Sequence, residues 1–236
     1  VRYIAKANQA QSDLSVLRRV VRWSYYDRKA QDEKSFLWFI QTRFHAHFRE
    51  TVQKLRTATD LGDRYSRLGR IVNYLQEMTS PAHVVPVYAS RWWRLRRTRD
   101  RFDNYSIDRD AVERMIGNDC SPIERAVDDY QSVLVATAEK TLGALQEKIP
   151  GMPVTWQAFW QLETAGKFGR YGIAGNNFGR SVEFPCKQRK DEYCVLLRKD
   201  PLYEGFAVER HSEAVQATMR AMWLTQMFSY RGANKP

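Results

Sequence analysis

Residues 68–83 read LGRIVNYLQEMTSPAH, and this stretch decides the predicted fold. Its apolar residues recur at helical spacing and form one stripe of a helix predicted over residues 63–79: Leu68, Ile71, Val72, Leu75 and Met78. Ser80-Pro81 ends this helix, because the residue before a proline avoids the helical backbone conformation. The stretch therefore predicts a helix, a proline turn and a histidine, His83, soon after the turn.

Helical periodicity also dominates the rest of the chain. Further helices are expected over residues 12–23, 33–59, 106–117, 121–148 and 207–229. Residues 166–181 are rich in glycine, which predicts a loop, and residues 181–197 predict a small β-hairpin. The sequence thus indicates a mainly α fold, with a single helical domain over residues 1–230 and a flexible tail over 231–236.

The chain of 236 residues carries 38 basic and 27 acidic side chains, a formal net charge of +11. Such a surplus favours anionic partners, which include phospholipid headgroups, nucleic acids and acidic proteins. A basic surface that serves only solubility explains the same surplus. No apolar run approaches the roughly 18 residues of a membrane-spanning helix, so no transmembrane segment is expected.

Cys120, Cys186 and Cys194 are the only cysteines. Cys186 and Cys194 flank KQRKDEY, which suits a turn between two short strands, and we expect a disulfide between them. A disulfide fits an oxidising compartment, so the expected location is secreted or periplasmic. Three free thiols in a cytoplasmic protein are the alternative.

The stretch 68–83 resembles a motif of the zinc-dependent phospholipase C and single-strand-specific nuclease superfamily. The family helix reads LG-x-x-x-H-Y-x-x-D-x-x-x-P-x-H, in which a histidine and an aspartate four residues apart share one face and bind metal. The matching residues here are Asn73, Glu77 and His83. Glu77 keeps a carboxylate, whereas Asn73 offers an amide oxygen, which zinc favours little.

Two further stretches carry the resemblance. RDRFDNYS is similar to an H-x-x-x-E element of the family, with Arg99 at the histidine position and Asp103 at the acidic position. DLSVLRRVVRWSYYDR is similar to an upstream element, with Asp13 at the acidic position and Ser24 at the histidine position. An arginine cannot ligate a metal ion and repels it.

The resemblance implies a multi-helix phospholipase C/nuclease-like domain whose ligand positions are degenerate at Ser24, Asn73 and Arg99. The candidate metal ligands that survive are Glu77, His83, Asp103 and Asp13. With so few ligands, we expect the chain to bind either no metal or a single divalent metal such as zinc, and not the family's metal cluster. The other histidines, His45, His47 and His211, are interpreted as structural or solvent-facing.

An arginine-tryptophan run, RWWRLRRTRDR, covers residues 91–101 and follows His83. Arginine binds phosphate bidentately, and tryptophan stacks on bases or lies at a membrane interface. We therefore expect an anion site that consists of Arg94, Arg96, Arg97 and Arg99 with Trp92 and Trp93. A solvated basic loop with its tryptophans anchored in the core is the alternative.

The sequence favours a non-catalytic member of this family that binds a phosphate-containing ligand, such as a phospholipid headgroup or nucleic acid, or a partner protein. No G-x-S-x-G or H-E-x-x-H motif supplies another catalytic centre. A metal-dependent phosphodiester hydrolase with a reduced metal site, phospholipase C-like or nuclease-like, is the second hypothesis. A scaffold or interaction protein is the third.

Overall fold

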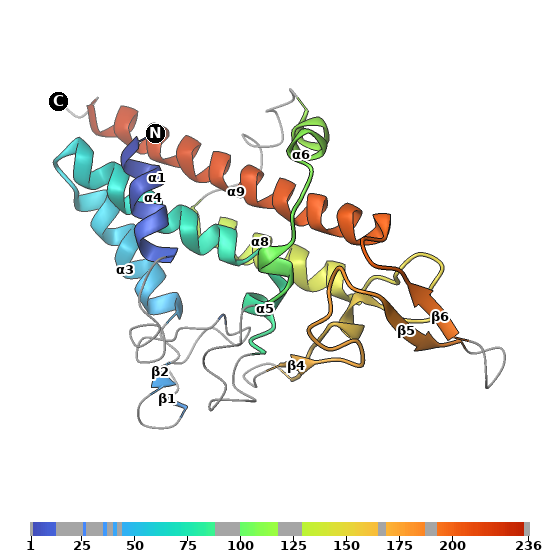
Figure 1. Cartoon of the computed structure of the whole chain (residues 1–236). Helices are drawn as coiled ribbons and strands as arrows, with labels where there is room; N and C mark the ends of the chain where they lie inside the picture. The colour runs from blue at the N-terminus through green and yellow to red at the C-terminus, as the bar shows by residue number, and fades with distance from the viewer. Residues whose placement is uncertain are drawn as a thin grey trace. The chain divides into compact units, whose positions relative to one another are not determined.

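The computed structural model describes residues 2–12, 26, 35–36, 40–41, 44–87, 100–117, 129–164, 169–186 and 193–233. Helices predominate in these residues, beside short antiparallel strand pairs, which confirms the mainly α prediction (Figure 1). The chain divides into two compact units. Unit 1 comprises Val1–Met78, Asn118–Thr137 and Glu213–Pro236, and unit 2 comprises Thr79–Gly117 and Ala138–Ser212. The single domain over residues 1–230 stays a prediction.

The central helix of unit 1 is α4, Leu61–Glu77, which confirms the helix predicted over 63–79. Asp60 caps it, because the Asp60 side chain accepts a hydrogen bond of 2.7 Å from the backbone N–H of Asp63. The predicted apolar stripe is buried, with Leu68, Ile71 and Leu75 almost fully removed from solvent. The apolar residues that recur at helical spacing in this stretch therefore form the face of α4 that packs in the core.

Two further helices of unit 1, α1 (Arg2–Ser12) and α3 (Phe44–Thr57), pack against α4. Gly69 allows α1 to approach closely, because a Cβ atom at this position would lie 2.4 Å from the backbone oxygen of Ile4. The glycine of the 68–83 stretch thus has a packing role in this chain.

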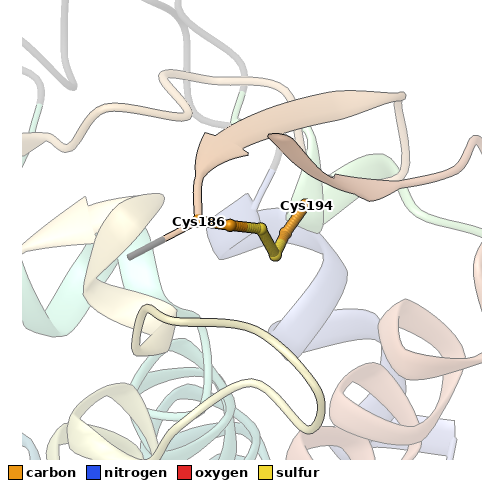
Figure 2. Close-up of a disulfide and its surroundings, with 2 residues drawn as sticks. All are labelled: Cys186 and Cys194. Carbon is orange, nitrogen blue, oxygen red and sulfur yellow. A yellow bond between two sulfur atoms is a disulfide. The ribbon is translucent and has the colours of Figure 1, made fainter. Parts of the chain in front are cut away.

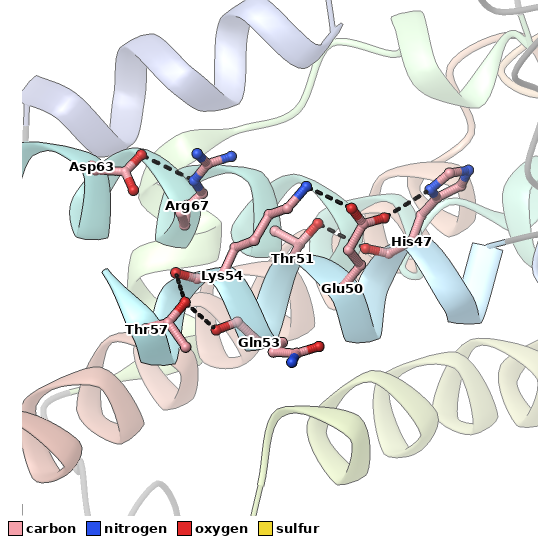
Figure 3. Close-up of polar contacts among 8 residues, drawn as sticks. All are labelled: His47, Glu50, Thr51, Gln53, Lys54, Thr57, Asp63 and Arg67. Atoms are coloured by element: carbon pink, nitrogen blue, oxygen red, sulfur yellow. Dashed lines mark hydrogen bonds and ion pairs between the residues drawn. The ribbon is translucent and has the colours of Figure 1, made fainter. Parts of the chain in front are cut away.

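The outward face of α3 carries short-range polar contacts (Figure 3). Lys54 donates to the Glu50 carboxylate, and His47 Nδ1 lies 3.8 Å from Glu50 Oε2. On α4, Arg67 Nε donates to Asp63 Oδ1 at 3.0 Å. His47 is partly exposed, in line with its interpretation as structural or solvent-facing, and helical spacing produces pairs of this kind.

The prediction of a helix over residues 33–59 is wrong at residues 35–36 and 40–41. β1 (Ser35–Phe36) pairs antiparallel with β2 (Ile40–Gln41), and α3 begins only at Phe44. This stretch is rich in aromatic and β-branched residues, which favour extended backbone, and periodicity alone does not separate a short apolar strand from a buried helix. Of the helix predicted over 12–23, only Ser12 lies among the described residues, and it ends α1.

Unit 2 has a core of closely packed aromatic rings. They come largely from two short 3-10 helices, η2 (Phe102–Asn104) and η3 (Trp156–Ala158), and from the segments that follow η3. The ring centroids of Trp156 and Phe206 are 4.3 Å apart, and Phe102 packs edge-on against neighbouring rings. This packing fixes η2, which carries one of the predicted site residues.

Two long helices supply residues to both units: α8, Tyr130–Gln146, and α9, Pro201–Ala233. α9 starts earlier than the predicted 207–229, because the Asp200 side chain accepts a hydrogen bond of 3.0 Å from Leu202 N and proline suits the first helical position. It also continues into the range expected as a tail.

Two other predicted helices are present with shorter bounds. α6 covers Arg109–Ile116, within the predicted 106–117, and the Asp108 side chain caps it. α8 lies within the helix predicted over 121–148 and ends at Gln146, before the β-bridge between Lys148 and Thr155. In the described residues, no helix combines the length and apolar character that crossing a membrane requires.

The hairpin predicted near 181–197 is confirmed. β5 (Val182–Pro185) pairs antiparallel with β6 (Tyr193–Leu196). Cys186 and Cys194 form the predicted disulfide, with Cα atoms 5.6 Å apart, and tie the strand ends together (Figure 2).

The described part of the glycine-rich segment is mostly turns, as predicted, apart from β4 (Arg170–Tyr171), which pairs with β3 (Trp160–Gln161). Gly172 lies against η3, where a Cβ atom would be 2.4 Å from the backbone oxygen of Gln157. The segment is therefore packed against the aromatic core of unit 2.

Candidate functional site

A tight turn presents Ser80 and His83 at the start of unit 2. Pro81 begins the short helix α5, Pro81–Val84, and Ser80 occupies its N-cap with extended backbone. The Ser80 side chain makes no capping bond. Its hydroxyl donates instead to Asp103 Oδ1 at 2.6 Å, so the turn is joined to η2.

A buried carboxylate, Asp100, fixes the segment that carries Asp103. Asp100 Oδ1 accepts from Phe102 N at 2.8 Å, and Asp100 Oδ2 accepts from Trp160 Nε1 and the Tyr171 hydroxyl, each at 2.9 Å. Burial raises the pKa of Asp100, while the hydrogen bonds from Trp160, Phe102 and Tyr171 act in the opposite direction. Asp100 is therefore a structural anchor for η2.

His83 and Asp103, two of the four predicted metal ligands, lie side by side. His83 Nε2 is 3.8 Å from Asp103 Oδ2, and the two side chains are 32% and 31% exposed, so a ligand can reach them. Burial acts to raise the pKa of Asp103. The hydrogen bond and charge of His83, the hydrogen bond from Ser80 and the charge of His211 outweigh burial and lower it.

His211 of α9 also acts on Asp103, because its charge contributes to the lowered pKa of that carboxyl. Its Nδ1 lies 2.8 Å from the backbone oxygen of Ala207. Because a carbonyl oxygen only accepts, Nδ1 carries the proton, and Nε2 is left for another partner. The His211 ring lies 5.8 Å from the Phe102 ring. We call Ser80, His83, Asp103 and His211 the Asp103 cluster.

Asn73, a degenerate ligand position, has a different role in unit 1. It is buried, and its Nδ2 donates to Asn8 Oδ1 at 3.0 Å. Asn8 Nδ2 donates in turn to Gln76 Oε1 at 2.9 Å, and Gln76 Nε2 lies 3.4 Å from Thr218 Oγ1. The amide at this position thus links α4 to α1.

Of the remaining predicted site residues, the structure describes Glu77. Glu77 ends α4 in unit 1 and is half-buried. The others lie outside the described residues: Asp13, Ser24, Trp92, Trp93, Arg94, Arg96, Arg97 and Arg99.

Sequence reasoning missed three residues of this region. Ser80 and Asp100 stand within the two quoted stretches, beside Pro81 and three residues before Asp103, so their positions were a usable signal. His211 lies in a helix far away in the sequence, where the pattern indicates a structural or solvent-facing histidine, and no local pattern connects it with Asp103.

Among the described residues, the donors that lie together do not match the ligand set of the family's zinc cluster. Among the described residues, no group of three or more histidine, cysteine, aspartate or glutamate side chains is arranged to hold a metal ion. The cluster instead offers two imidazoles, a hydroxyl and an ionised carboxylate, which suit hydrogen bonding and charge compensation. No significant match to the chain was found among protein-family models, curated proteins or solved structures.

Proposed function

We propose that this chain is a non-catalytic relative of the zinc-dependent phospholipase C and single-strand-specific nuclease superfamily that binds a phosphate-containing ligand at the Asp103 cluster. The observation that carries the proposal is the pairing of His83 with Asp103, at two positions where the family places metal ligands. Asp103 also accepts from Ser80, so its carboxylate already serves two protein groups.

The imidazoles provide the means to bind an anion. His83 Nε2 lies 3.8 Å from Asp103 Oδ2, and a protonated imidazole carries a positive charge and donates hydrogen bonds from its ring nitrogens. With Nδ1 bonded to Ala207, a protonated His211 has its second N–H at Nε2. Phosphate oxygens accept such charge-assisted hydrogen bonds, and the net charge of +11 favours the approach of anions.

The fate of Asn73 supports the non-catalytic part of the proposal. The family has a metal-binding histidine at this position, whereas the buried amide here bonds to Asn8 in α1. A side chain used for helix packing does not serve as a zinc ligand, and amide oxygens suit zinc poorly.

The arginine run extends the proposal to further anion contacts. In the sequence, the run lies between two residues of the cluster, His83 and Asp103. Its arginines are Arg94, Arg96, Arg97 and Arg99. We propose that these arginines contribute bidentate contacts to the phosphate group.

The test compares binding with turnover in the full chain. Inorganic phosphate is titrated by calorimetry, and hydrolysis of bis(p-nitrophenyl) phosphate is followed with and without added zinc. We expect saturable phosphate binding and no hydrolysis. His83→Gln should weaken binding about tenfold, the effect of one lost charge-assisted hydrogen bond.

The matched control is His47→Gln, because His47 also lies 3.8 Å from a carboxylate but on the outer face of α3. It should leave phosphate binding unchanged. Zinc-dependent, chelator-sensitive hydrolysis that His83→Gln abolishes would establish the phosphodiester hydrolase instead. Absence of both binding and hydrolysis would leave the scaffold hypothesis.

A further inference from the structure

A row of apolar side chains lies on the outer face of the β5–β6 hairpin. Tyr193 is 61% exposed, Val195 39% and Leu197, which directly follows β6, 63%. They alternate with Leu196, which is fully buried together with Phe184 of β5. Since successive strand residues point to opposite faces, one face of the hairpin packs on unit 2 and the other presents this apolar row.

Three cations gather at the end of the hairpin opposite the disulfide. Arg198 N donates to Ser181 Oγ at 3.0 Å, and Lys199 N donates to the backbone oxygen of Gly179, so Arg180, Arg198 and Lys199 lie on neighbouring backbone. All three side chains are exposed. Within the described residues, none of the three forms an ion pair with an acidic side chain.

We propose that this hairpin face docks on a membrane surface that contains anionic lipids. The apolar row would lie at the boundary between headgroups and acyl chains, where an amphipathic tyrosine is favourable. The three cations would pair with lipid phosphates, each contributing through the negative surface potential. The proposal does not depend on the Asp103 cluster.

The short strands favour lipid over an added peptide strand. Each strand has only four residues, which offers few backbone groups to a partner strand. The apolar groups lie on the face of the hairpin and not along its edge. Glu183 pairs with Val195 across the hairpin and adds one carboxylate to the same face, so docking is expected to be shallow.

The experiment is co-sedimentation of the full, oxidised chain with vesicles of phosphatidylcholine, alone or mixed with phosphatidylglycerol. Wild type should bind the mixed vesicles, and high salt should weaken the binding. Leu197→Glu should weaken partitioning about tenfold or more, since it removes apolar contact and adds a repelled charge. Glu183→Gln should strengthen it about fivefold.

The matched control is Leu61→Glu. Leu61 has the same 63% exposure, and a glutamate suits its place in the first turn of α4, so the charge change is equal while the site differs. Its effect on partitioning should be small. Paired removal of two cations, Arg198→Gln with Lys199→Asn, should weaken binding to the mixed vesicles at least tenfold.

Three outcomes would overturn the proposal: no binding of wild type to the mixed vesicles, equal loss in Leu197→Glu and Leu61→Glu, or a dimer in sedimentation velocity that Leu197→Glu makes monomeric. The last would assign the face to a second copy of the chain. Two further measurements separate membrane docking from phosphate binding at the Asp103 cluster. The hairpin variants should still bind inorganic phosphate, and His83→Gln should still bind vesicles.

Discussion

Two histidine–carboxylate pairs in this protein have the same separation but different support. His83 Nε2 lies 3.8 Å from Asp103 Oδ2, and His47 Nδ1 lies 3.8 Å from Glu50 Oε2. The His47 pair joins residues three apart on one helix face, where spacing alone brings side chains together (Figure 3). The His83 pair joins two segments of unit 2 and has Ser80 bonded to its carboxylate.

Both carboxylates have a lowered pKa, but the causes differ. For Glu50, the hydrogen bond and charge of Lys54 come first, and the group lies in solvent. For Asp103, burial opposes ionisation and is outweighed by His83, Ser80 and His211. The distance between a histidine and a carboxylate therefore does not distinguish a functional site from a surface pair. What distinguishes the two is whether the fold holds neighbouring groups in place around the pair.

The largest effect is expected from removing the anchor behind the His83 pair. Asp100→Ala leaves the donors of Trp160, Tyr171 and Phe102 without their acceptor in a buried place. We expect a loss of about 3 kcal/mol in the free energy of unfolding, measured with urea. Asp63→Ala, which removes an exposed carboxylate bonded to Arg67, should cost below about 1 kcal/mol. An equal loss of unfolding free energy in both variants would contradict the role of Asp100 as a structural anchor.

A smaller effect tests the hydroxyl that holds Asp103. Ser80→Ala removes the 2.6 Å hydrogen bond to Asp103 and should weaken phosphate binding about fivefold, by about 1 kcal/mol, through looser placement of His83. Ser66→Ala is the control, because the Ser66 hydroxyl bonds only within α4, to the backbone oxygen of Gly62. Calorimetric titration of both variants decides; unchanged binding in Ser80→Ala would show that Asp103 needs no such support.

Asp100 and Asp103 should affect stability with opposite pH dependence in the acid range. Because the folded-state pKa of Asp103 is lowered, its ionised form contributes stability above the ordinary aspartate pKa of about 3.9, and this is lost as pH falls through the folded-state value. The difference in unfolding free energy between wild type and Asp103→Asn should therefore shrink on acidification. For Asp100→Asn the trend should reverse, because its raised pKa gives a contribution lost as pH rises. Parallel trends would contradict the two environments.

The smallest effect is the response of the two pairs to salt. Glu50 lies in solvent, so high salt should largely remove the lowering of its pKa, whereas Asp103 should retain most of its own. Carboxyl carbon shifts followed by NMR across the acid range at low and high salt measure both groups at once. Equal loss at both positions would mean that the Asp103 cluster is as open as the surface of α3.

The sequence predicted the parts of the fold that local rules control. The periodicity over 63–79 predicted α4, and the spacing of Cys186 and Cys194 predicted the disulfide and its hairpin. It failed at residues 35–36 and 40–41, where aromatic and β-branched residues fit a strand as well as a helix.

The candidate site was only partly predictable, since a motif names neighbours in sequence and a cluster needs neighbours in space. His83 and Asp103 were found from their two stretches, while Glu77 stays in the other unit. His211 enters only through the folding of α9, and the role of Asp100 depends on Trp160 and Tyr171, which come from distant segments.

The most direct test is an NMR titration of the four imidazoles with inorganic phosphate at slightly acidic pH. We predict saturable shifts of the His83 and His211 ring signals at one common affinity, with His47 unmoved and both responses lost together in Asp103→Asn. Equal, non-saturating shifts of His47 and His83 would contradict a phosphate site at the Asp103 cluster.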